Sequence, residues 1–342
     1  MSIKFEIINK IDILKSEWNE LIYNIDTPEI FFTYEWVSAV EKNYQYLREN
    51  EICLLIGREQ SKLVAIFPFC IKDKTVTFIT SEITDFNAVY INKECGKYRA
   101  IETAIDFLLD HQAVSKFFLS NMRGNEEVFI LEHILRKKGF SAFLEECSIC
   151  PYFDIEKDWN KVSNKRKQDV RRCERKLIKD YDCEFLTTSS FDTEIWEFIL
   201  KHKKQKFGDV DLDSEENRRF FEDISVSLKN NFRIHEIRLN GALAAVHVGF
   251  VDERKIYVYV SAFDRKYAEY GIGIVLFHYI MNENPDKIFD ALKGDEEYKF
   301  SWCPHVQMSF HLLAYKNNSK GVFPIIIMKM KNNKALRRIL GR

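Results

Sequence analysis

Runs of apolar residues interrupted by short charged turns recur along the chain. Residues 63–83, "LVAIFPFCIKDKTVTFITSEI", contain two apolar runs around the turn "KDK". Residues 243–263, "LAAVHVGFVDERKIYVYVSAF", contain two such runs around "DER". Aliphatic and aromatic runs on both sides of a short polar turn are typical of a β-hairpin. The pattern therefore predicts two hairpins.

The two hairpins align without a gap at an offset of 180 residues, which places Leu63 opposite Leu243. A strand-like run precedes each hairpin, "EICLLIGRE" and "FRIHEIRLN". Each hairpin is followed by an amphipathic helical pattern, "YRAIETAIDFLLDHQ" and "GIGIVLFHYIMNEN", and then by a further strand-like run. The same order of elements is thus predicted twice.

A pair of similar octets ends the two series. "MRGNEEVF" spans residues 122–129 and "LKGDEEYK" spans residues 292–299. The second octet has Asp295, Tyr298 and Lys299 where the first has Asn125, Val128 and Phe129. We interpret the chain as a duplicated α/β (α+β) unit, each copy a mixed central sheet flanked by helices. The predicted domains are residues 1–155 and 156–342.

Composition narrows the classes of function. The 342 residues are 46% hydrophobic and carry a net charge of −1, so no bulk attraction to nucleic acid or anionic lipid is expected. The N-terminus has no apolar signal-peptide region, and no apolar run reaches the roughly 20 residues of a membrane span. We expect a soluble cytoplasmic protein. The one dense basic stretch is "NKRKQDVRRCERKLIK".

The eight cysteines do not form a spaced framework. The single Cys-x-x-Cys, Cys147–Cys150, has no second pair and no His-x-x-x-His partner. Metal sites of this type need about four ligands at defined spacing. We therefore expect reduced thiols and no metal.

Two glycines, Gly271 and Gly273, stand at the predicted start of a helix that follows a strand. The first helical turn has free N–H groups, and glycine allows a phosphate oxygen to approach them. This arrangement suits a pyrophosphate, although two glycines can also simply shape a turn. The first half has only Gly96 at the corresponding place.

The second octet offers the chemistry that the first lacks. Tyr298 can donate a proton, Asp295 can accept one, and Lys299 can pair with a phosphate or carboxylate. A solvated charged turn is the alternative interpretation.

Four stretches resemble those of tandem GNAT acyltransferases, the branch that includes Fem peptidoglycan aminoacyl transferases and acyltransferases of bacterial polysaccharide synthesis. They are "TPEIFFTYEWVSAV", "SNKRKQDVRRCERKL", "DRKYAEYGIGIVLF" and "FDALKGDEEYKFSW". The last resembles the family's Asp-x-x-Arg-Gly-Asp-Glu-Pro-Tyr-Lys pattern, with Lys293 in place of Arg and Glu297 in place of Pro.

The resemblance implies a fold of two GNAT-like domains and acyl-coenzyme A as the co-substrate, without a metal. It implies that the backbone at Val260, Ser261 and Ala262 binds the pantetheine arm, and that Gly271 and Gly273 bind the pyrophosphate with Lys299 assisting. Tyr298 would protonate the departing thiolate. Asp295, then Glu296, then His247 are the candidates to accept the amine proton, although a histidine in a strand is more often a core residue.

The first domain is expected to bind the acceptor, because it lacks the cofactor features. Tyr34 and Trp36 suit stacking, and Asp85 and Asn87 suit sugar hydroxyls. Arg166 and Arg171 in the basic stretch suit a diphosphate. Core packing, turn formation and a solvated helix face are the respective alternatives.

The function expected first is an N-acyltransferase that acylates a nucleotide-linked, dTDP-type amino-deoxy sugar in surface-polysaccharide synthesis. The partners would be this small molecule and acyl-coenzyme A, with no nucleic acid and no membrane. One alternative is Fem-type transfer from aminoacyl-tRNA. Members of that branch usually insert a long helical hairpin for tRNA, and the sequence shows no such insertion. The other is a non-catalytic accessory protein.

Overall fold

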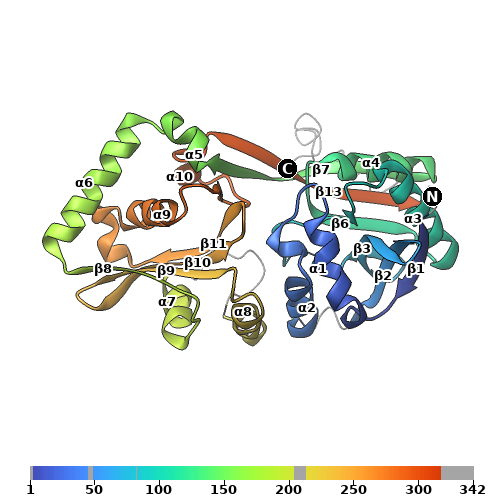
Figure 1. The fold of residues 1–342 in the computed structure, drawn as a ribbon, viewed down its shortest axis with the longest axis horizontal. Helices are drawn as coiled ribbons and strands as arrows, with labels where there is room; N and C mark the ends of the chain where they lie inside the picture. The colour runs from blue at the N-terminus through green and yellow to red at the C-terminus, as the bar shows by residue number, and fades with distance from the viewer. Residues whose placement is uncertain (1–2, 45–48, 82, 204–212, 317–342) are drawn as a thin grey trace, which may run out of the picture. The chain divides into compact units, whose positions relative to one another are not determined.

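The computed structural model describes residues 3–44, 49–81, 83–203 and 213–316. These residues form two compact units. Of the described residues, the first unit takes 3–41, 49–81, 83–147 and 309–316, and the second takes 42–44, 148–203 and 213–308. Figure 1 shows the elements of each.

The first unit is a sheet with helices on it. Its strands are β1 (Lys4–Ile8), β2 (Glu51–Glu59), β3 (Lys62–Lys72), β4 (Thr75–Phe78), β5 (Tyr90–Ile91), β6 (Lys116–Arg123), the start of β7 (Phe140–Asp154) and the end of β13 (His305–Lys316). Its helices are α1 (Lys15–Tyr23), α2 (Tyr34–Asn43), α3 (Lys97–His111) and α4 (Glu126–Lys137), with short 3-10 helices η1 (Asp12–Leu14) and η2 (Ile30–Phe32).

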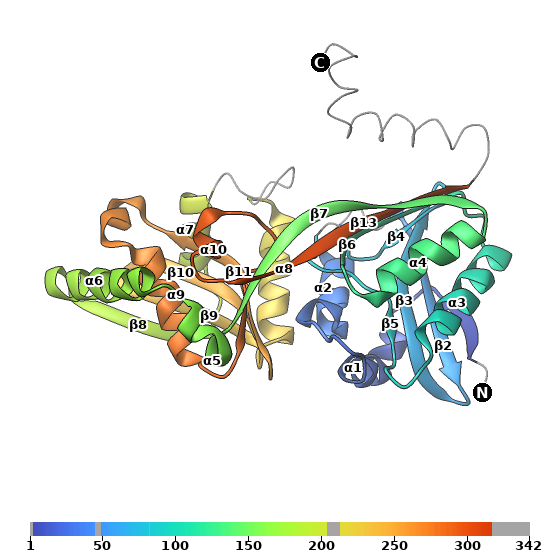
Figure 2. The same ribbon diagram turned by 90° about the horizontal axis from the view of Figure 1, so that it is seen from above.

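The order of strands in this unit is β1-β2-β3-β4-β6-β13, with β5 paired to β3. β4 and β6 run parallel, whereas the pairs β1–β2, β2–β3, β3–β4 and β6–β13 are antiparallel. Helices α3 and α4 lie side by side (Figure 2) and bury their apolar stripes against the sheet. The stripe of α3 follows helical spacing, with Ala100, Ile101, Ala104, Ile105 and Leu108 buried.

The second unit has the strands β8 (Cys183–Thr188), β9 (Phe232–Leu239), β10 (Ala242–Val251), β11 (Lys255–Phe263) and β12 (Ile288–Asp290), and the end of β7. Its helices are α5 (Ile155–Asp158), α6 (Asn164–Asp180), α7 (Thr193–Lys203), α8 (Glu215–Ser227), α9 (Ile272–Glu283) and α10 (Glu297–Phe300), with η4 (Trp159–Lys161) and η5 (Arg265–Tyr270).

Its strand order is β7-β12-β11-β10-β9-β8. Only β11–β12 is parallel among the described pairs of this unit. α6 packs against α9 (Figure 1), and both contribute to one apolar core with the sheet. A separate aromatic cluster joins α7 and α8 to the sheet, with Trp196 and Phe221 packed against Phe191 and Phe221 against Tyr259.

The predicted fold class is confirmed, because the structure has mixed α/β sheets flanked by helices. Both predicted hairpins are present, as β3–β4 and β10–β11. The chain also runs twice through strand, hairpin, helix, strand, helix and strand, first from β2 to β7 and then from β9 to β13. Gene duplication as the origin of this order stays a prediction.

The domain functions predicted for residues 1–155 and 156–342 also stay predictions. The compact units change over between Cys147 and Ser148, and the described residues from Ser309 on belong to the first unit. The cause is strand pairing: the end of β7 pairs with β12, and β13 pairs with β6. Apolar patterns predict strands but not which strands pair.

Candidate functional site

Strand β11 leaves its neighbour β12 part-way along its length. The two pair in parallel from Lys255 opposite Ile288 to Tyr257 opposite Asp290. β11 then continues to Phe263 and, within the described part of the chain, pairs only with β10 on its other side. The β12 side of Val258–Phe263 is therefore a strand edge, and such edges offer N–H and C=O groups to an added chain.

A bulge marks the place where β11 turns away. The β10–β11 register shifts between Val248 and Phe250, so that β11 carries one residue more than β10. A Cβ atom added to Gly249 would lie 2.2 Å from the Tyr257 carbonyl oxygen and 2.5 Å from Cε1 of His247. Only glycine fits there. Because a bulge bends its strand and increases the twist, it accounts for the separation.

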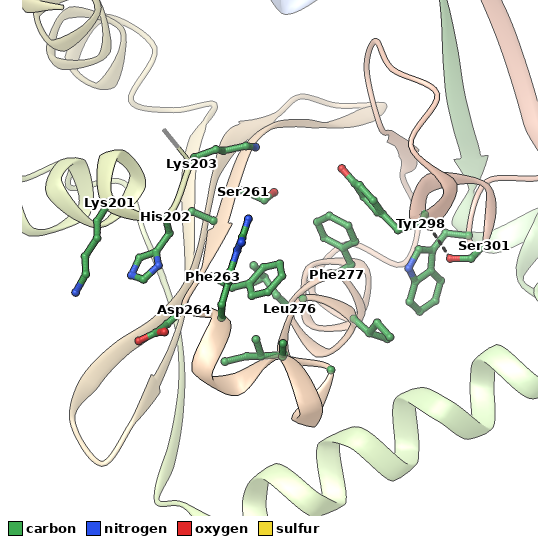
Figure 3. Close-up of a pocket in the computed structure, with 18 of the residues that line it drawn as sticks. Lys201, His202, Lys203, Ser261, Phe263, Asp264, Leu276, Phe277, Tyr298 and Ser301 are labelled. Carbon is green, nitrogen blue, oxygen red and sulfur yellow. Dashed lines mark hydrogen bonds between the residues drawn. The ribbon is translucent and has the colours of Figure 1, made fainter. Parts of the chain in front are cut away.

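A cavity of about 1040 Å³ lies in the second unit beside this open edge (Figure 3). This volume is at the upper end of the range usual for small-molecule sites. Residues predicted from the sequence that line it are Ser261, Ala262, Gly271, Gly273, Tyr298 and Arg166. The structure therefore brings the predicted glycines, the strand edge and the tyrosine together.

The two glycines have different local roles. Gly271 ends η5 in the left-handed region (φ +64°), and a Cβ on it would lie 2.6 Å from Sγ of Cys173 on α6. Close packing of α6 thus requires glycine there. At Gly273 a Cβ would meet the Phe263 ring at 3.4 Å. Both stand at the start of α9, where the positive end of the helix dipole favours an anion.

Basic side chains dominate the charged part of the lining. Arg166, Lys201, Lys203 and Arg265 line the cavity, and Asp264 is the acidic residue among the lining residues. The guanidinium carbon of Arg166 lies 5.4 Å from the centroid of the Trp302 ring, a cation–π arrangement that holds it in place. The lining suits an anionic ligand.

Tyr298 supplies the phenol of the cavity, and Figure 3 shows it on the opposite side from Ser261. It is the second residue of α10, and its ring centroid lies 5.7 Å from that of Phe277 on α9. Burial raises the pKa of Tyr298 above its ordinary value, and the negative charge of Glu296 adds to the effect. The phenol is therefore protonated at neutral pH and able to donate.

Lys299 of the second octet bonds to other residues of the same turn. Nζ of Lys299, which is only 7% exposed, donates to the Lys293 carbonyl at 2.6 Å and pairs with Glu296 at 3.0 Å. Lys299 and Glu296 do not line the cavity, and Asp295 is exposed outside it. Sequence spacing alone could not separate the one residue that faces the cavity from those that hold the turn.

Two further residues predicted for this site lie behind its wall. Val260 is completely buried, so only its backbone remains a candidate for contact with a ligand. His247 is also completely buried and does not line the cavity; its Nδ1 lies 3.1 Å from Nδ1 of His235. Burial holds the pKa of His247 well below its ordinary value, so the imidazole is neutral.

The residues predicted to bind the acceptor in the first unit are mainly buried there. The Tyr34 hydroxyl donates to Asp12 at 2.8 Å, and Trp36 Nε1 donates to the Thr84 hydroxyl at 2.8 Å. The Asn87 side chain bonds to Thr80, Ser81 and Ser120. Asp85 is half-buried. In the second unit, Arg171 lies exposed on α6 and does not line the cavity, unlike Arg166.

Sequence reasoning missed the contribution of α7. Lys201, His202 and Lys203, in its last turn, line the cavity. Burial, with help from Lys201 and Lys266, lowers the pKa of His202, and Asp264 opposes the effect. The available signal was the basic run "KHKK" at residues 201–204, which lies 67 residues before Gly271 in the chain.

Within the described residues, no group of three or more His, Cys, Asp or Glu side chains is arranged to hold a metal ion. The cysteines described are all free thiols. No helix in the described part of the chain is long and apolar enough to cross a bilayer.

Comparison with protein families places most of the residues that line the cavity inside a known domain type. Residues 164–300 match the acetyltransferase (GNAT) domain family. This segment contains α6, the open strand β11, the glycines at α9 and Tyr298. No curated protein matches the chain.

Solved structures similar to the chain cover nearly all of it. A conserved protein of unknown function from Bacteroides thetaiotaomicron has 14% identity and a TM-score of 0.57, over 92% of this chain and 100% of that one. FemX has 8% identity and a TM-score of 0.60, over 94% and 99%. A tandem GNAT protein from the clavulanic acid pathway has 9% identity and a TM-score of 0.51, over 93% and 100%. At identities this low, the similarity supports a conclusion about the fold alone, which is of the GNAT acyltransferase type.

Proposed function

We propose that the protein is an acyl-coenzyme A-dependent N-acyltransferase that acylates the amine of a nucleotide-linked amino-deoxy sugar. The observation that carries the proposal is the cavity in the second unit, where a strand edge, a glycine-bearing helix start, a basic lining and a protonated tyrosine converge. All the residues that line this cavity, except Ser301 and Trp302, belong to the segment that matches the GNAT domain.

The donor fits the cavity in three respects. Its phosphates are anionic, as the side chains of Lys201, Lys203 and Arg265 and the start of α9 require. Its arm carries amide groups that can extend a sheet along the open edge of β11 at Ser261 and Ala262. Its length calls for a large cavity, and about 1040 Å³ is available.

The chemistry asks for few catalytic groups. A neutral amine attacks the thioester carbonyl carbon, a C–N bond forms, and the C–S bond breaks. Tyr298 gives its phenol proton to the departing sulfur, for which it must be protonated at the working pH. Orientation of amine and thioester in one cavity supplies a large further part of the rate. Asp295 stays the proposed acceptor of the amine proton. Because it lies outside the cavity lining, the proton would reach it through water.

The acceptor is proposed from the resemblance to polysaccharide-associated acyltransferases. Arg166 lines the same cavity as the glycines, and its guanidinium stands over Trp302. A planar guanidinium suits a diphosphate, because it can donate two parallel hydrogen bonds. We therefore propose that Arg166 binds the diphosphate of the nucleotide-linked acceptor.

The test mixes the protein with acetyl-coenzyme A and a panel of amines and measures free thiol. The panel contains dTDP-linked amino-deoxyhexoses, the same sugars without nucleotide, and amino acids; a gel-shift with tRNA runs in parallel. Thiol release with the nucleotide-linked sugars alone is expected. Release with no amine, together with no rise in Tm on adding coenzyme A, contradicts the proposal, since a ligand of the native state must stabilise it.

A further inference from the structure

Cations cover the exposed side of helix α6 in the second unit. This helix contains eight basic and three acidic residues, although the net charge of the whole chain is −1. Its opposite side, with Val170, Cys173 and Leu177, is buried in the apolar core. Six of the basic residues are exposed, and we call them the cation face: Lys165, Arg171, Arg172, Arg175, Lys176 and Lys179.

Acidic side chains neutralise only two members of the cation face. Arg172 pairs with Asp169 at 3.0 Å, and Nζ of Lys176 lies 3.6 Å from Glu269. In the described part of the chain, no acidic side chain stands within ion-pair distance of the other four. The face therefore keeps a local excess of positive charge.

This distribution of charge destabilises the helix that carries it. Lys165, Arg166 and Lys167 occupy the first turn, which has no acidic residue, although the positive end of the helix dipole disfavours cations there. Arg171 and Arg175 stand four positions apart, and like charges at this spacing repel each other.

Helix α8 of the same unit has the ordinary distribution. Glu215 and Glu216 stand in its first turn. Arg218 and Arg219 each pair with a glutamate four positions away, at 3.1 Å. Because α8 follows the rules that α6 breaks, the cation face is better explained by a partner outside the chain than by the needs of the fold.

An exposed apolar side chain beside the cations indicates the kind of partner. Ile178 is 54% exposed and stands three positions after Arg175. The surface of an anionic bilayer matches both features, because cations bind its headgroups and an aliphatic side chain enters the interface. A nucleic acid would pair with the cations and leave Ile178 in water.

We propose that the cation face and Ile178 bind the surface of an anionic lipid bilayer. Figure 1 shows α6 along one side of the second unit. Arg166 of the same helix lines the cavity, so this contact brings the candidate site to the bilayer surface. The net charge of −1, from which we expected no attraction to anionic lipid, averages the cation face with acidic residues elsewhere. The inference goes beyond the proposed function and depends on neither donor nor acceptor.

Sedimentation of the full-length protein with vesicles tests the inference. Binding is expected to phosphatidylcholine vesicles that contain about 30 mol% phosphatidylglycerol, and not to pure phosphatidylcholine. About 0.5 M NaCl should release the protein, because salt screens the charges. Arg171→Gln combined with Arg175→Gln should weaken binding about thirtyfold, which is roughly fivefold for each cation.

The matched control is Arg218→Gln combined with Arg219→Gln, which removes the same charge from α8 and should bind like the wild type. No binding to the anionic vesicles, or equal binding by the two double variants, overturns the proposal. Neither result depends on coenzyme A or on an amine, so the proposed function stands or falls separately.

A further comparison distinguishes a bilayer from a nucleic acid. Ile178→Ser should weaken vesicle binding about tenfold, because the side chain loses its apolar contact with the interface. A gel shift with duplex RNA at about 0.15 M salt should show no complex. Vesicle binding that Ile178→Ser leaves unchanged, or RNA binding that Arg171→Gln with Arg175→Gln abolishes, overturns the proposal.

Thermal unfolding shows whether the cations serve a partner or the fold. Arg171→Gln with Arg175→Gln should have a Tm equal to or above that of the wild type, because the change relieves repulsion within α6. A variant with a lower Tm, or one that does not fold, would show that these cations stabilise the chain itself, which overturns the proposal.

Discussion

The two units share a strand order, and in each unit two parallel strands separate part-way along their length. The space between these strands is filled in the first unit and open in the second. In the first unit, β4 and β6 pair only at Thr75–Lys116 and Val76–Phe117 within the described residues, and β4 ends at Phe78. In the second, β11 runs on to Phe263 after its pairing with β12 ends. Each unit therefore has a place where two parallel strands part.

The first unit fills this place with its own chain. The Asn87 N–H donates to the Asn121 carbonyl at 2.9 Å, and Nδ2 of Asn121 donates to the Thr84 carbonyl at 2.9 Å. Phe86 is buried beneath Arg123, whose guanidinium carbon lies 3.6 Å from the ring centroid. The described loop residues between β4 and β5 thus act as a plug.

The second unit leaves the place open. Its loop after β11 turns at once into η5 and α9, so Ser261 and Gly273 face a cavity. The octets repeat the contrast: Val128 is completely buried in the core, whereas Tyr298, at the corresponding place, is 44% exposed and lines the cavity. The comparison teaches that one topology makes either a packed core or an open cavity, depending on whether a loop occupies the gap.

The largest expected effect comes from Gly249→Ala, which attacks the bulge that opens the second unit. The new Cβ would meet a backbone carbonyl at 2.2 Å, so the strands must move apart. We expect a loss of about 3 kcal/mol in the free energy of unfolding, measured with urea. Gly96→Ala in the first unit, where no atom lies within 4 Å of the new Cβ, is the control and should be nearly neutral. Equal stability of the two variants would contradict the account.

Acid should weaken the second unit through its buried histidines. Burial lowers the pKa of His235 to about 4, from an unfolded value near 6.5, so the unfolded chain binds the proton more readily. The stability contributed by neutral His235 is therefore complete above pH 6.5 and is lost as the pH falls toward 4. The loss amounts to about 3 kcal/mol. Urea titrations at several pH values check this, and His235→Asn should flatten the slope; an unchanged slope would be contradictory.

Tyr298→Phe sharpens the contrast between the octets. The change removes the phenol proton and leaves the ring packed on Phe277. Loss of a general acid should lower kcat roughly 10²-fold and leave the KM for the donor unchanged. Steady-state thiol-release kinetics measure both. A variant with full kcat would show that Tyr298 does not protonate the thiolate.

The smallest effect is expected from Asn87→Ala, which loosens the plug of the first unit. Its side chain bonds to Ser81 O and Ser120 O, so its loss leaves buried carbonyls without that donor. We expect a loss of about 1–2 kcal/mol in unfolding free energy and no change in the Kd for coenzyme A. Weaker coenzyme A binding would place a donor contact in the first unit and break the comparison.

Sequence patterns predicted what depends on local order. The hairpins and the glycine-started helix follow from apolar periodicity and turn residues, and both are where they were expected. Tyr298, which the octet differences singled out, lines the cavity, and its catalytic role stays a prediction. The plug was not predictable, because Asn87 has the same polar side chain whether it binds a sugar or donates to buried carbonyls. The contribution of Lys201 and Lys203 was not predictable either, because it depends on packing between elements far apart in the chain.

Amide hydrogen exchange with and without coenzyme A tests the central claim most directly, because it reports the two gaps in one experiment. The account predicts protection of β11 from Val258 to Phe263 and of the first turn of α9, with no change in residues 83–91 of the first unit. Protection of residues 83–91 with an unchanged β11 would contradict it, as would no protection anywhere at saturating coenzyme A.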